Sequence, residues 1–181
     1  IFISPKFDAG SEFHEGIALV ILEKSRYYID TLGQFLPTPE LEDAELFYEG
    51  LAAVKFAGRY GFINLTGLWQ IQPIFQQAFG FKEGRARIKR NEKWGFINRQ
   101  GQMVIPAKYE NADDFSMGLA MVQLNGLYGF VNTSGSVQIP CLFDMATRFQ
   151  ANGSAEVQQN GQFFFLRYYR CSNTGHATLA H

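Results

Sequence analysis

The chain has 181 residues, and its 46% hydrophobic and 18% charged content is typical of a folded domain with its own core, which excludes a disordered chain. Its formal net charge of −1 excludes an overall electrostatic preference for nucleic acid or for an anionic membrane. No apolar run approaches the roughly 18 residues of a membrane span, so we expect no spanning helix. Because the chain begins at Ile1 and not at Met, we expect a trimmed or processed product.

A first motif, Phe-x-Glu-Gly-x-Ala, recurs along the chain at steps of 34 residues. A fixed period of this length indicates a repeat protein. The copies begin at Phe13, Phe47, Phe81, Phe115 and Phe149, of which the fourth is looser and the fifth carries one inserted residue. We therefore interpret residues 1–169 as one domain of five units centred on these phenylalanines. The polar tail, residues 170–181, is expected to be flexible.

Two further series keep the same period. Tyr-Gly-Phe-Ile-Asn at 60–64 returns as Trp-Gly-Phe-Ile-Asn at 94–98 and as Tyr-Gly-Phe-Val-Asn at 128–132, with degenerate copies at 26–30 and 163–166. The third series consists of Phe7, Leu41, Phe75, Tyr109 and Phe143. Three series with one period indicate that the repeat runs through the whole domain.

The fourth unit illustrates the geometry expected of each repeat. Residues 120–124 read as a strand, and Asn125-Gly126 supplies the positive φ angles of a tight hairpin turn. Residues 128–132 form the returning strand, and a type I turn with Asn first and Gly last leads to a third strand at 137–143. Each unit is thus predicted to be a three-stranded antiparallel sheet without a helix.

The third unit carries the clearest resemblance to a known family. Residues 93–101, Lys-Trp-Gly-Phe-Ile-Asn-Arg-Gln-Gly, followed by Val-Ile-Pro-Ala-Lys-Tyr at 104–109, resemble a near-consensus copy of the bacterial WG repeat, also called KWG. The resemblance covers roughly residues 3–166. It implies a β-repeat architecture and a binding or scaffolding role, and it carries no shared catalytic residues. The first and fifth units lack the Gly after the aromatic residue, as capping copies at the ends of an array often drift.

The arrangement of the five units has two interpretations. Our first expectation is an open stack that forms a twisted solenoid. The alternative is a closed, five-bladed, propeller-like ring, because the chain begins with a third strand at 1–7 and ends with a hairpin at 155–169 that could pair with it. Units of 34 residues are short for propeller blades, which favours the open stack.

The first strand of each unit has one face that repeats and one that does not. Ala and Val or Ile recur two residues apart, as in Ala52 and Val54, so this face is predicted to be core. The opposite face changes from aliphatic to cationic to acidic, and we take it as the candidate surface for a partner. Its candidate residues are Ile17, Leu19, Leu51, Arg85, Arg87, Lys89, Leu119 and Met121. The alternative is that these side chains pack internally or are solvated, with the acidic stretch 40–49 neutralising the basic band.

No arrangement of residues predicts catalysis. His14 occupies a position that varies between units, while His176 and His181 lie in the polar tail. Glu15, Glu49 and Glu83 repeat, which favours support of a turn over a general acid. Cys141 and Cys171 are too few for a metal cage, and whether they pair stays open. We therefore expect no enzyme, no cofactor and no metal site.

The sequence favours a protein-binding repeat module, with no nucleic-acid partner. A narrower hypothesis is an immunity protein that neutralises a toxin by blocking its active site through complementary charge. The alternative is a carbohydrate or cell-wall binding module in which Trp69 stacks on a sugar ring. The partner's identity and the oligomeric state stay open. The cytoplasm is slightly favoured as the compartment, and a removed signal peptide would instead indicate the periplasm or secretion.

Overall fold

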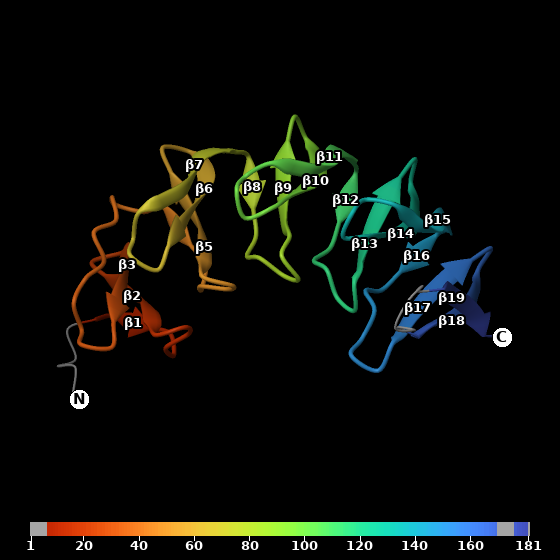
Figure 1. Ribbon diagram of the computed structural model, residues 1–181, viewed down its shortest axis with the longest axis horizontal. Coiled ribbons are helices and arrows are strands. Elements are labelled where there is room, and N and C mark those ends of the chain that lie inside the picture. The colour runs from red at the N-terminus through yellow and green to blue at the C-terminus, as the bar shows by residue number, and fades with distance from the viewer. Residues whose placement is uncertain (1–6, 170–175, 181) are drawn as a thin grey trace.

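The computed structural model describes residues 7–169 and 176–180, and all of the regular structure in these residues is β-structure. The strands form five antiparallel sheets, one for each predicted unit. The sheets follow one another along an arc, with the first and the fifth at opposite ends (Figure 1). The predicted all-β tandem array is therefore confirmed, and its arrangement is open. No described residue belongs to a helix that could cross a membrane.

Four of the five sheets consist of a two-residue strand followed by three longer ones. The first sheet contains β1 (Ala9–Gly10), β2 (Ile17–Leu22) and β3 (Ser25–Asp30). The second contains β4 (Asp43–Ala44), β5 (Leu51–Phe56), β6 (Arg59–Asn64) and β7 (Trp69–Phe75), and the third β8 (Gln77–Ala78), β9 (Ala86–Arg90), β10 (Lys93–Ile97) and β11 (Met103–Tyr109). The fourth contains β12 (Asn111–Ala112), β13 (Leu119–Leu124), β14 (Leu127–Asn132) and β15 (Val137–Phe143). The fifth contains β16 (Met145–Ala146), β17 (Ser154–Gln159), β18 (Gln162–Tyr169) and β19 (His176–Ala180).

Two parts of this topology differ from the prediction. The short strand that opens each sheet was not among the three strands predicted for each unit, and it pairs with the edge of the strand that follows. In the tail, the backbone of β19 pairs with β18, so part of the segment that we had expected to be flexible completes the fifth sheet. The remaining tail residues, Cys171 and His181 among them, lie outside the described residues.

The hairpin between β13 and β14 has the turn predicted from its sequence. Asn125 and Gly126 have φ angles of +53° and +78°, and Leu124 and Leu127 face each other across the turn. Glu15 and Gly16, in the first motif, also have consecutive positive φ angles, of +53° and +83°. The motif of each of the first four units is thus itself a second tight hairpin that leads into the long strand pair.

The glycine of the second series is required by the neighbouring backbone. In the third sheet, β11 has a register shift opposite Gly95, and a Cβ atom at Gly95 would lie only 2.6 Å from the carbonyl oxygen of Ile105. The register places Tyr27 of the first unit and Phe164 of the fifth at the same position. Neither of those two sheets has a bulged strand at this position. In the first sheet, β3 makes only isolated bridges on that side. In the fifth sheet, β18 and β19 pair without a register shift. The terminal units therefore tolerate a side chain where the inner ones do not.

The core is divided into clusters that lie at the joints between successive units. In each of the four joints, an aromatic ring on the second long strand packs edge-on against the motif phenylalanine of the next unit, with centroids 4.9–5.1 Å apart. The pairs are Tyr28–Phe47, Phe62–Phe81, Phe96–Phe115 and Phe130–Phe149. All eight rings are buried. The repeating aromatic residues are thus the contacts that hold successive sheets together.

Candidate functional site

A row of non-repeating side chains connects the first three units. The residue after the motif phenylalanine is His14, Tyr48 and Lys82 in these units. The rings of His14 and Tyr48 have centroids 4.6 Å apart, and Lys82 Nζ lies 3.4 Å from the centroid of the Tyr48 ring. Equivalent positions of successive units therefore touch here, and the identity of each residue changes along the row. We call these three residues the variable row.

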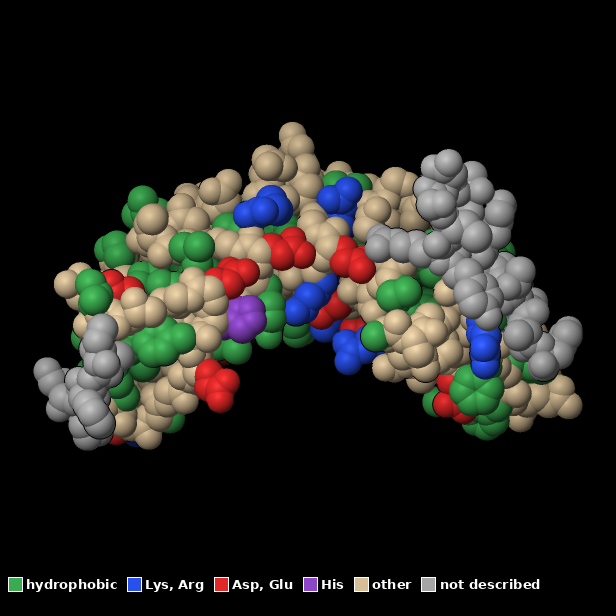
Figure 2. Space-filling view, turned by 60° about the horizontal axis from the view of Figure 1, so that its bottom comes forward, with side chains coloured by type: hydrophobic (Ala, Val, Ile, Leu, Met, Phe, Trp, Pro, Cys, Tyr) green, Lys and Arg blue, Asp and Glu red, His purple; other side chains and the backbone are tan. Residues whose placement is uncertain are grey.

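A pocket of about 370 Å³ opens beside the variable row. Besides Tyr48 and Lys82, its lining includes Leu19 of the first unit, Glu45 and Leu46 of the second, Phe79 of the third and Asp114 of the fourth. We call it the central pocket. Four consecutive units contribute to it, so it exists only when the units are stacked. Figure 2 shows acidic and basic side chains next to one another across the middle of the arch, close to its hollow side.

Arg87 connects the central pocket to the fourth unit. Its Nε atom is 2.8 Å from Asp114 Oδ1, an ion-pair contact that lacks hydrogen-bond geometry. Its Nη1 donates a hydrogen bond of 2.7 Å to the carbonyl oxygen of Ala112. The guanidinium carbon lies 3.8 Å from the centroid of the Phe79 ring, within cation–π range. Arg87 therefore supports the wall of the pocket and is not a free cation.

Two carboxyl groups of the central pocket are in a poorly hydrated environment. Burial raises the pKa of Glu45, although the backbone N–H of Gly80 donates to its Oε2 at 2.8 Å and opposes this shift. Burial also raises the pKa of Asp114, against the opposing effect of Arg87. Desolvated charges interact more strongly with a partner that covers them than charges in water do.

The basic band that we had taken as a partner surface consists of Arg85, Arg87 and Lys89, and these cations interact mainly with groups of the same molecule. Arg85 Nε donates to the carbonyl oxygen of Thr133 at 2.9 Å, and Lys89 Nζ lies 2.9 Å from Glu92 Oε2. With the Arg87–Asp114 pair, each cation of the band has an internal partner. The ion-pair partners of Lys89 and Arg87 are Glu92 and Asp114, which lie outside the acidic stretch 40–49 that the alternative interpretation had considered.

The apolar part of the predicted partner surface requires a correction. Ile17, Leu51 and Leu119 are buried, because successive sheets cover both faces of the first long strand in each unit. The repeating face is core as predicted, and the opposite face is core as well at these positions. Leu19 and Met121 are half-buried, and Leu19 alone of the two reaches the central pocket.

Trp69, the candidate for sugar stacking, is half-buried against the core shared by the first two units. Its ring centroid lies 6.2 Å from that of Phe56. One part of the indole is therefore already covered by protein, which leaves less of it free to stack on a ligand.

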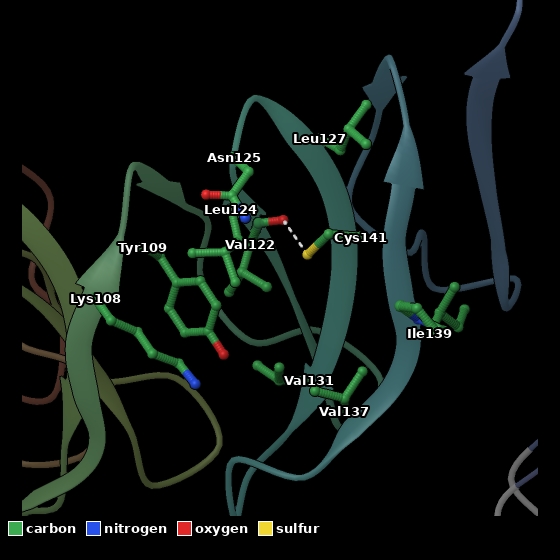
Figure 3. Close-up of a pocket in the computed structure, with 11 residues that line it drawn as sticks. Lys108, Tyr109, Val122, Leu124, Asn125, Leu127, Val131, Val137, Ile139 and Cys141 are labelled. Atoms are coloured by element: carbon green, nitrogen blue, oxygen red, sulfur yellow. Dashed lines mark hydrogen bonds between the residues drawn. The ribbon is translucent and has the colours of Figure 1, made fainter.

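A second pocket, of about 340 Å³, lies between the third and fourth sheets. In Figure 3, Tyr109 and Lys108 of β11 face Val122 and Cys141 from the fourth sheet. The lining is mainly apolar, and the Sγ atom of Cys141 is 3.9 Å from the carbonyl oxygen of Val122. Burial raises the pKa of the Cys141 thiol, which keeps it protonated at neutral pH and makes it a poor nucleophile. We call this the lateral pocket.

The described residues contain no group of three or more His, Cys, Asp or Glu side chains placed to hold a metal ion. Only some of the residues that line the central pocket could be predicted from the sequence. The variation at His14, Tyr48 and Lys82 was visible as a position that does not repeat, but Asp114 and Phe79 belong to other units and are brought there by stacking. The signal that could have identified them is the same variation at two positions just before the motif phenylalanine.

Comparison with known proteins supports the repeat. A family model described as "WG containing repeat" matches residues 1–24, 28–60, 60–94, 94–128 and 128–163. A comparison with curated protein sequences found no match. Among solved structures, KlHsv2 with its loop 6CD replaced by a Gly-Ser linker is similar, with a TM-score of 0.52, 10% identity and coverage of 90% of this chain. Kluyveromyces lactis Hsv2 with its complete loop 6CD gives a TM-score of 0.46, 10% identity and 90% coverage.

The chain spans 61% and 58% of the lengths of those two structures. At 10% identity, the first likeness shows only that the sheets follow one another as they do in a β-propeller-like protein.

Proposed function

Because the chain belongs to the WG-repeat family, we propose that it is a non-catalytic protein-binding module whose recognition site is the central pocket. The observation that carries this proposal is that repeating and non-repeating residues occupy different places in the fold. Residues that repeat in every unit form the joints, where each unit needs the same contact. Residues that differ between units, such as Tyr48, Lys82 and Asp114, line one pocket.

The chemistry of the pocket suits a protein segment with an apolar side chain next to a charged group. Leu19, Leu46 and Phe79 supply apolar walls, while the carboxyl groups of Glu45 and Asp114 line the same pocket as Lys82. An aromatic and aliphatic centre with charges at its edge is the usual composition of an energetically important contact between proteins. The mixture of charge signs favours a partner of complementary pattern over a polyanion.

The narrower function that we propose is inhibition of another protein, as in an immunity protein that covers a toxin's active site. Charges arranged around a pocket accelerate the approach of such a partner and discriminate against others. This proposal rests on the charge pattern at the central pocket, whereas the broader proposal needs only that the pocket binds protein.

The test is affinity capture from the source cell with three matched baits. The wild-type chain should retain a partner, and Lys82→Glu should lose it, because the substitution reverses the one ammonium group of the variable row. Arg59→Glu reverses an exposed cation at the start of β6, which does not line the pocket, and should retain the partner. Equal recovery with Lys82→Glu and Arg59→Glu, confirmed by calorimetry with the purified partner, would exclude the central pocket as the site.

A further inference from the structure

Several residues that line the lateral pocket occupy positions that change from unit to unit. Lys108 stands where the second unit has Ile74. Leu124 and Leu127 stand where the third unit has Arg90 and Lys93. The aromatic joints between sheets form in other units without these residues, so the joint itself does not require them. The pocket therefore has a composition that packing between units does not explain.

Tyr109 contributes a buried hydrogen-bond donor to this pocket. It is only 2% exposed, and its hydroxyl group makes no hydrogen bond to the described residues, whereas those of Tyr28 and Tyr60 each donate one. Burial raises the pKa of Tyr109, so the hydroxyl group stays protonated at neutral pH and can donate. The counterparts of Tyr109 are all apolar, namely Phe7, Leu41, Phe75 and Phe143. The repeat thus requires a large apolar side chain here but no hydroxyl group, and a buried donor of this kind needs an acceptor.

The ammonium group of Lys108 lies close to this hydroxyl group. Its Nζ atom is 5.2 Å from the centroid of the Tyr109 ring, and Figure 3 shows the two polar groups next to each other. Lys108 forms no ion pair within the described part of the chain. The carboxylate of the following residue, Glu110, is instead paired with Lys93 and with the adjacent hairpin turn. Two donors of the pocket, one of them charged, are therefore available to the same acceptor.

We propose that the lateral pocket binds a small monocarboxylate with an apolar body, such as a medium-chain fatty acid. The carboxylate accepts hydrogen bonds from Tyr109 and Lys108, and the apolar body lies against Leu124, Val131 and Ile139. A volume of about 340 Å³ is in the range of small-molecule sites. A single cation matches one negative charge better than the several charges of a phosphate. The site is separate from the central pocket, so the proposal goes beyond the protein-binding function.

The first test is calorimetric titration of the full chain with octanoate, and separately with octanamide, which has the same apolar chain and no charge. We expect octanoate to bind at a single site. Octanamide should bind about tenfold more weakly or worse, because hydrogen bonds to a charged acceptor are the stronger kind. Equal binding of the two compounds, or no binding of octanoate, would overturn the proposal.

Two variants remove one donor each. Tyr109→Phe copies the residue that other units carry at this position, so the fold should be kept, and Lys108→Gln removes the charge at an exposed site. Each should weaken octanoate binding about fivefold or more. The matched controls, Tyr60→Phe and Lys24→Gln, remove a hydroxyl group and a charge outside the pocket and should bind like the wild type. Wild-type affinity in either pocket variant would contradict the proposal.

Cys141 provides a test of where the ligand binds. In a Cys171→Ser background it is the only thiol of the chain, and it lines the lateral pocket. Octanoate at about ten times its Kd should slow the alkylation of Cys141 by iodoacetamide about tenfold, because only the unoccupied fraction reacts. An unchanged rate of alkylation would place octanoate elsewhere on the protein and would also overturn the proposal.

Discussion

The carboxylate of Glu83 accepts a hydrogen bond of 2.7 Å from the backbone N–H of Gly118, the glycine of the next unit's motif. Glu15 and Glu49 make the equivalent bonds to Gly50 and Gly84, at 2.8 and 3.0 Å. Each partner lies 35 residues further along the chain. The repeated glutamate was expected to support a turn, and the structure places that turn in the following unit. The motif therefore encodes a joint between units as well as a hairpin.

Replacing Glu83 by Ala should weaken the joint between the third and fourth units. We expect the free energy of unfolding to fall by about 0.5–1.5 kcal/mol, the usual net contribution of one hydrogen bond. Urea denaturation measures it. Glu23→Ala is the matched control, because Glu23 also has a positive φ angle, of +50°, while its side chain makes no hydrogen bond to the described residues. An equal loss in both variants would assign the effect to the backbone rather than to the bond.

Replacing Phe96 by Ala tests the aromatic joints. Phe96 is fully buried, and its ring lies 4.9 Å from that of Phe115 in the next unit. We expect a loss of about 3–5 kcal/mol, as is usual when a buried phenylalanine is truncated. Phe163→Ala, at an exposed position, should change the free energy of unfolding of the monomer by a small fraction of that. A loss below about 1 kcal/mol for Phe96→Ala would contradict the assigned core.

The sequence was most informative where one contact recurs. The repeating face that contains Ala52 and Val54 is core as predicted, and the hairpin at Asn125-Gly126 forms as its residues predict, because local backbone preference and burial act alike in each unit. The prediction was wrong for Leu51 and Leu119, which are buried on a face expected to be open. The alternation of side chains along a strand predicts which residues share a face, but it does not predict whether a neighbouring sheet covers the second face.

The central pocket was harder to predict for a related reason. Glu45, Phe79 and Asp114 belong to three different units, and their proximity depends on the angle between successive sheets, which the period does not encode. The open or closed arrangement depends on the same angle, accumulated over five units. Arg87 was assigned to the surface because its partner, Asp114, lies 27 positions away in the sequence and in the next unit.

Gly95 provides a test of the second repeated series. Gly95→Ala would bring a Cβ atom to 2.6 Å from the carbonyl oxygen of Ile105, so backbone must move. We expect a loss of about 1–3 kcal/mol, the usual cost of overpacking, measured by thermal or urea unfolding. Phe164→Ala is the control at the equivalent position of the fifth unit, where the chain already carries a side chain. If Gly95→Ala keeps wild-type stability, β11 does not approach as closely as described.

A further repeat emerges only from the structure, in which one side chain of each unit accepts a hydrogen bond from the hairpin turn between the two long strands. The acceptors recur at steps of 34 residues and are Asp8, Glu42, Gln76, Glu110 and Asp144. In the fourth unit, Gly126 N–H donates to Glu110 Oε2 at 2.8 Å. This bond is the main cause that holds the pKa of Glu110 below its ordinary value, and Lys93 adds to it.

Glu110→Gln should therefore destabilise the protein in a pH-dependent manner. A carboxyl group whose pKa is lower in the folded state stabilises it above the ordinary pKa, near 4.5, and this stabilisation is lost as the pH falls through the lowered value. We expect the urea midpoint of Glu110→Gln to lie below that of the wild type at neutral pH and to approach it in acid, as Glu110 becomes protonated. Glu12→Gln, whose carboxyl group makes no hydrogen bond to the described residues, should show no such convergence. If the difference in urea midpoint between Glu110→Gln and the wild type is the same at neutral and at acid pH, the hydrogen bond from Gly126 stabilises the fold independently of the charge of Glu110.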